Sequence, residues 1–303
     1  MFRHPAPCTR RIRCMGRCSL ARCSRVPAPG FDESRSPALL ATHFPVLSSL
    51  AEYVVGSVAV LSAIAAVYHR TGRSASIASG AAACAVLVGG MALLATASYV
   101  VAAQSPFPMM DDALSAADRW LHFDWAAWTA WGRAHPWLWR AQAVAYDAMH
   151  PELGLLVLYL GLRERATPLI VSLFVGGAIA IGASWFVPAI GHLPDAPHVP
   201  VLLALRGGTL PDGVPQGLIS FPSYHTTVAI LLTAALSRER FLFAIACALN
   251  GVMVISTLSM GGHYLVDVLA GIVVAVAAMY LAPRLETRIA ALQNKSTPQH
   301  QSE

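Results

Sequence analysis

The sequence predicts an all-α membrane protein, a polytopic bundle of six or seven transmembrane helices. The chain of 303 residues is 56% hydrophobic and only 12% charged, whereas soluble domains carry about 25% charged residues. Its apolar residues gather in runs that approach the ~20 residues needed to cross a bilayer as a helix. The formal net charge of +5 comes from arginines that punctuate these runs and form no stripe, which argues against nucleic acid as a partner.

The N-terminal segment, residues 1–44, is predicted to be a disordered, Arg-rich leader. It holds eight arginines and several prolines, and its first acidic residue is Asp32. No apolar stretch follows the basic part directly, which argues against a cleaved secretory signal. Four of the six cysteines lie in this segment at spacings that match no zinc template, so we expect neither a structural disulfide nor a metal site.

Seven apolar runs follow, and each is a candidate transmembrane helix. They cover residues 48–68, 77–102, 142–162, 168–190, 222–237, 241–259 and 264–283. Together they predict a membrane-embedded domain over 45–285, followed by a cytoplasmic tail at 286–303. Seven spans would put the Arg-rich leader outside the cell, against the positive-inside rule. A count of six, in which the first run does not cross, therefore stays open beside a count of seven.

The basic residues between the runs predict the orientation of the helices. One set of alternate connections carries nine of them and the opposite set carries four. The nine are Arg70, Arg73, Arg163, Arg165, Arg238, Arg240, Arg284, Arg288 and Lys295. We therefore expect these connections in the cytoplasm. The segments that precede the runs at 222–237 and 264–283 then lie on the extracytoplasmic side of the cell membrane.

The segment 103–141, on the side opposite those arginines, contains six of the seven tryptophans. Trp125, Trp128 and Trp131 recur every three residues, and four aspartates supply the polar complement. The pattern predicts one or two amphipathic helices that lie in the lipid interface as anchors. A lid or lateral gate for a lipid substrate is the alternative.

Two short motifs, each opening an apolar run, hold the candidate chemistry. The first ends at His225, and the second contains His263 and Asp267. The pair in the second motif is four residues apart, which puts both side chains on one helical face, where a carboxylate can orient an imidazole. Helix N-termini bind phosphate, and Arg206, in a loop with two glycines, can clamp a phosphate with paired donors. Because ionisable groups are costly at membrane depth, this group indicates a functional site.

These motifs resemble those of the type-2 phosphatidic acid phosphatase superfamily. The family's second motif, Pro-Ser-Gly-His, reads Pro-Ser-Tyr-His at residues 222–225. Its third motif, Ser-Arg, five residues, His, three residues and Asp, fits Ser256, His263 and Asp267, with Thr257 in place of the arginine. The bulky residue before the first histidine and the missing arginine both point to the branch of inositol phosphorylceramide synthases. The catalytic core is expected at 200–283.

The family's first motif has no counterpart here, because it needs a lysine and Lys295 is the only lysine of the chain. Arg206 is the expected substitute as phosphate clamp. The resemblance is specific over about residues 203–275 and absent before about residue 45.

The resemblance implies an integral-membrane enzyme that acts on a phospholipid or lipid phosphate without a metal or cofactor. It implies that His263 attacks phosphorus and becomes a phosphohistidine, that Asp267 holds its imidazole, and that His225 moves protons at the leaving and incoming oxygens. The expected substrate-binding residues are Arg206, Ser223 and Tyr224. Water as the acceptor makes a lipid phosphatase, and a hydroxyl of another lipid or polyol makes a phosphotransferase.

Two other classes of function stay open. A catalytically inactive relative would bind lipid only, since each lost cation weakens charge stabilisation at phosphorus. A lipid transporter would be expected to carry ionisable groups nearer the middle of its spans, whereas in this sequence they cluster at one interface.

Overall fold

A computed structural model describes residues 45–209 and 217–296 of the chain. Within these ranges the chain forms eleven α-helices and no strand. The predicted leader at 1–44 and residues 297–303 of the predicted tail lie outside the described ranges. The all-α fold class is therefore confirmed over the described part of the chain.

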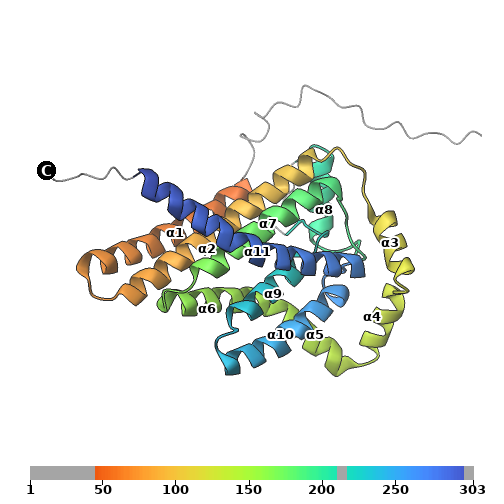
Figure 1. The fold of residues 1–303 in the computed structure, drawn as a ribbon. Coiled ribbons are helices and arrows are strands. Elements are labelled where there is room, and N and C mark those ends of the chain that lie inside the picture. The colour runs from red at the N-terminus through yellow and green to blue at the C-terminus, as the bar shows by residue number, and fades with distance from the viewer. Residues whose placement is uncertain (1–44, 210–216, 297–303) are drawn as a thin grey trace, which may run out of the picture. The chain divides into compact units, whose positions relative to one another are not determined.

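Five helices of the described residues are long and apolar enough to cross a bilayer. They are α1 (Pro45–Thr71), α2 (Ala75–Gln104), α7 (Thr167–Phe186), α10 (Arg240–Ser259) and α11 (Leu265–Ser296) (Figure 1). Two more predicted runs form shorter apolar helices, α6 (Met149–Leu162) and α9 (Tyr224–Ala235). Each of the seven predicted runs thus forms a helix, which agrees with a polytopic bundle.

The short α6 continues a preceding helix, α5 (Pro136–Asp147). Ala148 between them has helical backbone angles. Its amide donates to the Val144 carbonyl at 2.9 Å, and its carbonyl accepts from the Glu152 amide at 2.9 Å. Because the hydrogen-bond ladder runs through the junction, α5 and α6 form a nearly continuous rod. This rod starts earlier than the helix predicted at 142–162.

The helix α9 is too short to cross the membrane alone. Its 12 residues rise about 18 Å at ~1.5 Å per residue, against ~30 Å of hydrocarbon. The charged turn after it belongs at a water interface, and there Glu239 accepts hydrogen bonds from Arg163 and Arg165 at 3.3 and 3.1 Å. This contact also sets the α6–α7 turn beside the α9–α10 turn. A 12-residue helix that starts at one interface does not reach the opposite one.

The core of the bundle is formed by buried side chains of α2, α6, α7, α9, α10 and α11. Leu173 of α7, Leu231 of α9 and Met253 of α10 are almost completely buried. Small residues let these helices approach closely. A methyl group added to Gly176 of α7, for example, would lie 3.0 Å from the Thr227 side chain of α9. The close packing fixes the N-terminal end of α9 against its neighbours.

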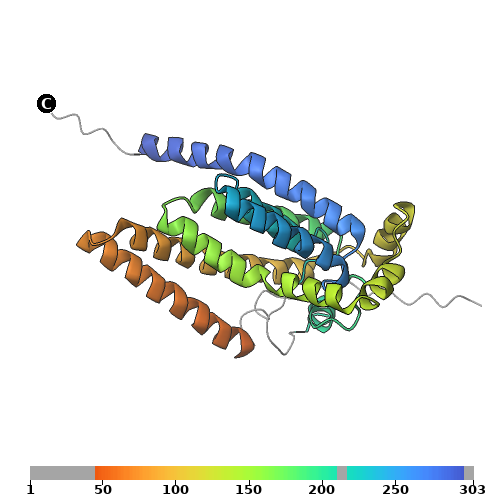
Figure 2. The ribbon, with the colours of Figure 1, turned by 90° about the horizontal axis from the view of Figure 1, so that it is seen from below.

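At the margin of the bundle, α1 lies alongside α2 (Figure 2). Its apolar side chains face outward, and Tyr53, Val55 and Val60 are each more than half exposed. An apolar face of this size suits lipid rather than water. Since α1 also has the length and composition of a span, it is itself a candidate membrane helix.

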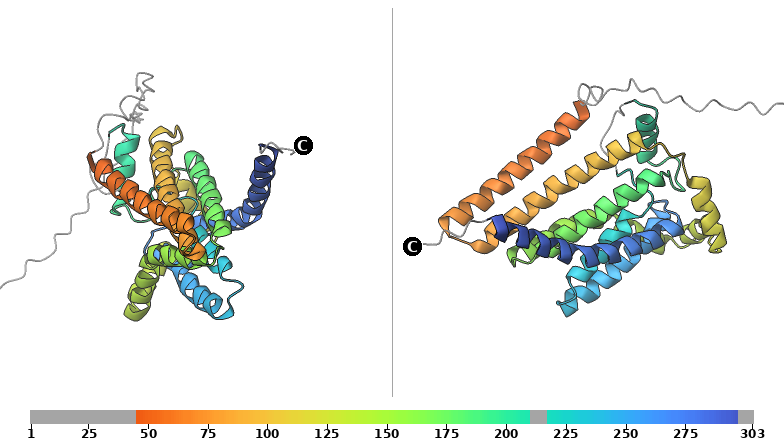
Figure 3. Two further views of the ribbon diagram at one scale, coloured as in Figure 1. Left: turned by 90° about the vertical axis from the view of Figure 1, so that its left-hand side faces the viewer. Right: turned by 45° about the horizontal axis from the view of Figure 1, so that its top comes forward.

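Three short helices gather at the end of the bundle that holds the two motifs (Figure 3). They are α3 (Asp111–Trp120), α4 (Trp125–Arg133) and α8 (His198–Arg206). Two of them, α3 and α4, belong to the tryptophan-rich segment 103–141, whose remaining part enters α5. This segment thus contributes to three helices, α3, α4 and α5, where one or two were predicted. The breaks between them fall at short turns after Trp120 and Arg133.

The tryptophans of α4 dock this segment on the bundle. Trp125 Nε1 donates to the Leu258 carbonyl at 2.7 Å, and Trp128 Nε1 donates to Ser259 Oγ at 2.9 Å, both at the end of α10. Other tryptophans, such as Trp120 at 79% exposure, remain open to the surroundings. The segment thus combines exposed aromatic anchors with side chains that bind the end of α10.

Candidate active site

The N-terminal turns of α9 and α11 lie side by side. The Ser223 amide donates to the Asp267 carbonyl at 3.0 Å, and Thr227 Oγ1 donates to the Gly271 carbonyl at 3.0 Å. These bonds join the first turns of both helices. The motif at residues 222–225 and the His–Asp motif of α11 therefore form one site.

His263 and Asp267 form the pair that their spacing predicts. Asp267 is completely buried and His263 is 5% exposed. The His263 Nδ1 atom lies 3.3 Å from Asp267 Oδ2, and the same oxygen accepts from the Tyr264 amide at 3.0 Å. A carboxylate in this position favours the tautomer with the proton on Nδ1. The Nε2 lone pair of His263 is then free to attack an electrophile.

His225 faces this pair from the first turn of α9. The centroids of the His225 and His263 rings are 6.3 Å apart, with the rings edge to face. On its other side the His225 ring stacks on Tyr146 of α5, at 4.7 Å between centroids and 15° between planes. Neither ring nitrogen of His225 has a hydrogen-bond partner among the described residues. The spacing of the two imidazoles suits a phosphoryl group held between them.

The turn before His263 has a shape that only glycine accommodates. Gly262 has a φ of +63°, and a Cβ there would lie 2.6 Å from Leu193 Cγ. Its carbonyl accepts from the His192 amide at 2.7 Å, and the His263 amide donates to the Thr257 carbonyl at 3.2 Å. The backbone of Thr257 thus helps to hold the backbone of His263.

Two aspartates of α3 clamp this region, and the sequence reasoning did not assign them to the site. Asp118, 2% exposed, accepts from the Leu265 and Val266 amides at 2.9 and 3.0 Å and so caps α11. Asp111 lies seven residues earlier on the same face of α3. It accepts from the Gly191 amide at 2.9 Å and from the Tyr264 hydroxyl at 3.0 Å. Their i, i+7 spacing in an amphipathic helix is the signal that could have indicated a shared buried face.

Two further histidines, His192 and His198, border the site. His192 stacks on Trp125 at 4.7 Å, and burial lowers its pKa although Asp118, 3.8 Å away, opposes the shift. Burial likewise lowers the pKa of His198, whose Nε2 lies 3.1 Å from the Ile190 carbonyl. Lowered pKa values favour neutral rings at neutral pH. In the described ranges, no three His, Cys, Asp or Glu side chains are arranged to hold a metal ion.

The predicted substrate ligands Ser223 and Tyr224 are used inside the protein. Ser223 is completely buried, and its hydroxyl oxygen caps α9 by accepting from the Thr226 amide at 3.3 Å. The Tyr224 hydroxyl donates to the Leu173 carbonyl of α7 at 2.9 Å, away from the histidine pair. Their side chains therefore stabilise α9 and its packing.

Arg206, the predicted phosphate clamp, is bonded to the protein through one of its nitrogens. It ends α8, and its Nη2 donates to the Phe107 carbonyl, while partial burial lowers its pKa. Nη1 is buried without a partner among the described residues. The helix start of α11, expected to present free amides to phosphate, is instead occupied by Asp118. Arg206 Nη2 and the first amides of α11 are thus engaged with the protein, whereas Arg206 Nη1 is not.

A comparison with protein families finds a match to the PAP2 superfamily over residues 112–281. The match begins in α3, extends into α11 and includes the whole histidine site. It is made at the level of the superfamily and does not single out the branch of inositol phosphorylceramide synthases. Comparisons with curated proteins and with solved structures find no match. Because the match covers more than half of the chain, this protein belongs to the PAP2 superfamily of phosphatases and phosphotransferases.

Proposed function

We propose that this protein is an integral-membrane enzyme that moves a phosphoryl or substituted phosphoryl group of a phospholipid or lipid phosphate through a covalent phosphohistidine at His263. One observation carries the proposal. The His263 Nδ1 atom lies 3.3 Å from the buried carboxylate of Asp267, which leaves Nε2 as the nucleophile, and the His225 ring lies 6.3 Å from the His263 ring. Family membership at the level of phosphoric-ester chemistry supports it.

The reaction has two displacements at phosphorus. In the first, the Nε2 lone pair of His263 forms a P–N bond while the P–O bond to the leaving group breaks, and the leaving oxygen takes a proton from His225. In the second, His225 removes a proton from the acceptor, whose oxygen forms a new P–O bond as the P–N bond breaks. Asp267 stabilises the positive charge that His263 carries in between.

The acceptor decides whether the enzyme is a phosphatase or a phosphotransferase. Water gives inorganic phosphate or a free head group, and a hydroxyl of a lipid or polyol gives a new phosphoester. The bulky Tyr224 and the threonine at position 257 support the transferase branch. The short α9 supports a lipid substrate, because it sets His225 below the membrane surface, at the depth of a lipid head group.

We place the site on the extracytoplasmic side of the cell membrane. The basic connections that hold Arg163, Arg165 and Arg240 lie at the ends of α6, α7 and α10 opposite those near His225 and His263. Arginine-rich short loops stay in the cytoplasm. This orientation supports access to lipids of the outer leaflet.

The test follows phosphorus with the purified full-length protein in mixed micelles with chelator. The substrates are phosphatidic acid and phosphatidylinositol labelled at phosphorus, with and without ceramide, diacylglycerol and inositol as acceptors. We expect label to move into inorganic phosphate or a new lipid with wild type, and not with His263→Ala. The matched control is His69→Ala, an exposed histidine at the end of α1, which should keep full activity.

Each outcome of this assay has a definite meaning. Label movement that persists in His263→Ala would overturn the phosphohistidine mechanism. Activity lost with chelator and restored by a divalent ion would overturn its metal independence. A complete lack of label movement would point to a protein that binds or transports lipid without turnover. The hydrogen bond from Arg206 to the Phe107 carbonyl is the observation that favours this alternative.

A further inference from the structure

The site lacks an obvious donor for the phosphoryl oxygens. Phosphoryl transfer depends on groups that stabilise the charge on the non-bridging oxygens. The three predicted ligands are wholly or partly engaged elsewhere, because Ser223 caps α9, Tyr224 donates to Leu173, and Nη2 of Arg206 donates to Phe107. A donor that lies directly beside the two imidazoles would complement them.

Tyr146, in the last turn of α5, lies beside both histidines. Its ring stacks on His225 at 4.7 Å. A methyl group built on Gly261 would lie 3.2 Å from Tyr146 Oη and 2.9 Å from His263 Cδ2. The phenol oxygen and the His263 imidazole therefore approach the same point on the glycine turn. The Tyr146 ring at the same time stacks on the imidazole of His225.

The Tyr146 hydroxyl has no hydrogen-bond partner among the residues that the structure describes. The Tyr146 side chain is partly exposed, so its hydroxyl is open to a ligand, whereas two other tyrosines of this region bond to the protein: Tyr224 bonds the Leu173 carbonyl and Tyr264 bonds Asp111. With an ordinary pKa near 10, a phenol remains protonated at neutral pH and can donate. An open donor beside the two imidazoles points to an oxygen of the substrate as its partner.

We propose that Tyr146 contacts the substrate, donating a hydrogen bond from its hydroxyl to a non-bridging phosphoryl oxygen while His263 attacks phosphorus. This inference rests on the proposed function. The hydroxyl stabilises charge that grows in the transition state, and the ring keeps His225 in its orientation. One neutral donor thus takes part of the role that cationic side chains play in other phosphoryl-transfer sites.

The test is Tyr146→Phe in the labelled-lipid assay, because this change removes only the oxygen and keeps the stack on His225. We expect kcat to fall about 100- to 1,000-fold, the range for removing one donor that acts in the transition state, with KM changed less than about threefold. Tyr159→Phe, the same change farther along the α5–α6 rod where the ring contacts Arg163, should leave kcat unchanged. A kcat for Tyr146→Phe within twofold of wild type would overturn the role of Tyr146. The proposed function would still stand in that case if label movement remained absent in His263→Ala.

Two further measurements separate the possible roles. Tyr146→Leu removes the stack as well as the oxygen. If Tyr146 only packed on His225, the Leu variant would be impaired and the Phe variant would not, which would contradict a donor role.

Orthovanadate, which mimics five-coordinate phosphorus, tests the site without a known lipid. We expect the affinity of Tyr146→Phe for orthovanadate, measured by tryptophan fluorescence, to be at least about tenfold weaker than that of wild type. Equal affinity would overturn the proposal, even if every labelled lipid proved inert and the proposed function failed.

Discussion

Asp267 concentrates its interactions on one oxygen. Its Oδ2 atom lies 3.3 Å from His263 Nδ1 and accepts from the Tyr264 amide and the Ser220 hydroxyl. A buried carboxylate needs such donors to remain ionised. The Tyr264 amide and the Ser220 hydroxyl hold the carboxylate in place before a substrate arrives. The carboxylate in turn orients the His263 imidazole.

Asp267→Asn should therefore impair catalysis far more than folding. The amide keeps the size of the side chain but loses the charge that favours the Nδ1–H tautomer and the positive phosphohistidine. We expect kcat to fall by about 10³-fold or more, by analogy with the same change in a serine protease triad, with a similar melting temperature. Ser220→Ala, which removes one of the three donors, should cost much less. An Asn variant with near-normal kcat would contradict the role of Asp267.

The role of His225 as the acid is tested by the leaving group. His225→Gln should slow turnover of a lipid phosphate, whose alkoxide needs a proton, by about 10²-fold or more. With a nitrophenyl phosphoester the loss should be at least about tenfold smaller, because nitrophenolate leaves without protonation. Steady-state kcat values for both substrates decide the point, and equal losses would rule out proton donation by His225.

At the scale of elements, the first turn of α11 is completed by another helix. The Leu265 and Val266 amides, two of the donors that a helix start leaves unpaired, donate to Asp118 of α3. Asp111 of the same helix binds the 190–191 backbone and Tyr264. Since His263 lies only two residues before the capped turn, α3 sets the position of the nucleophile without touching it.

Asp118→Ala should therefore reduce both stability and turnover. We expect a loss of about 1 kcal/mol in the free energy of unfolding, the usual cost of removing a cap, and a fall in kcat with little change in KM. Asp118→Asn, which retains one acceptor oxygen, should recover part of the activity. Asp112→Ala is the matched control, since Asp112 is exposed on the same helix. Equal kcat values for Asp118→Ala and Asp112→Ala would show that the clamp does not serve the site.

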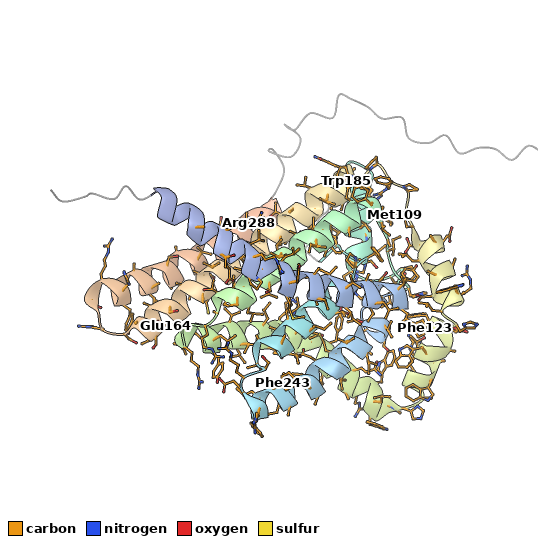
Figure 4. All side chains as sticks on the ribbon, in the orientation of Figure 1. Met109, Phe123, Glu164, Trp185, Phe243 and Arg288 are labelled. Carbon is orange, nitrogen blue, oxygen red and sulfur yellow. The ribbon has the colours of Figure 1, made fainter. Side chains whose placement is uncertain are left out.

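At the scale of the whole bundle, the helices separate two chemically different ends. Figure 4 shows Glu164 at the α6–α7 turn and Phe123 between α3 and α4, at opposite ends of the described helices. The first end carries the arginines that share Glu239. The second carries the histidine site under the tryptophan-rich helices.

This arrangement predicts which end faces the cytoplasm. In a background without the native cysteines, a membrane-impermeant maleimide applied to intact cells should label Ala116→Cys on α3 and not Arg238→Cys in the α9–α10 turn. Both positions are exposed, so the label reports sidedness rather than burial. Permeabilised cells, in which both variants should react, provide the control. The reverse pattern would place the site in the cytoplasm.

The sequence by itself determined the helical bundle, its seven apolar helices and the pairing of His263 with Asp267. These features depend on local signals, since an apolar run of sufficient length forms a helix in lipid and an i, i+4 spacing sets two side chains on one face. It also indicated that His225 shares the site, because each motif opens a helix at the same end.

Only the tertiary structure decided which other polar side chains serve the site. It turned Tyr224 toward α7 and Arg206 toward Phe107, and it brought Asp118 to an amide 147 positions away in the chain. It also set Tyr146 of α5 on the ring of His225. No local pattern encodes such contacts, because they depend on how buried polar groups from distant helices find partners once the helices have packed.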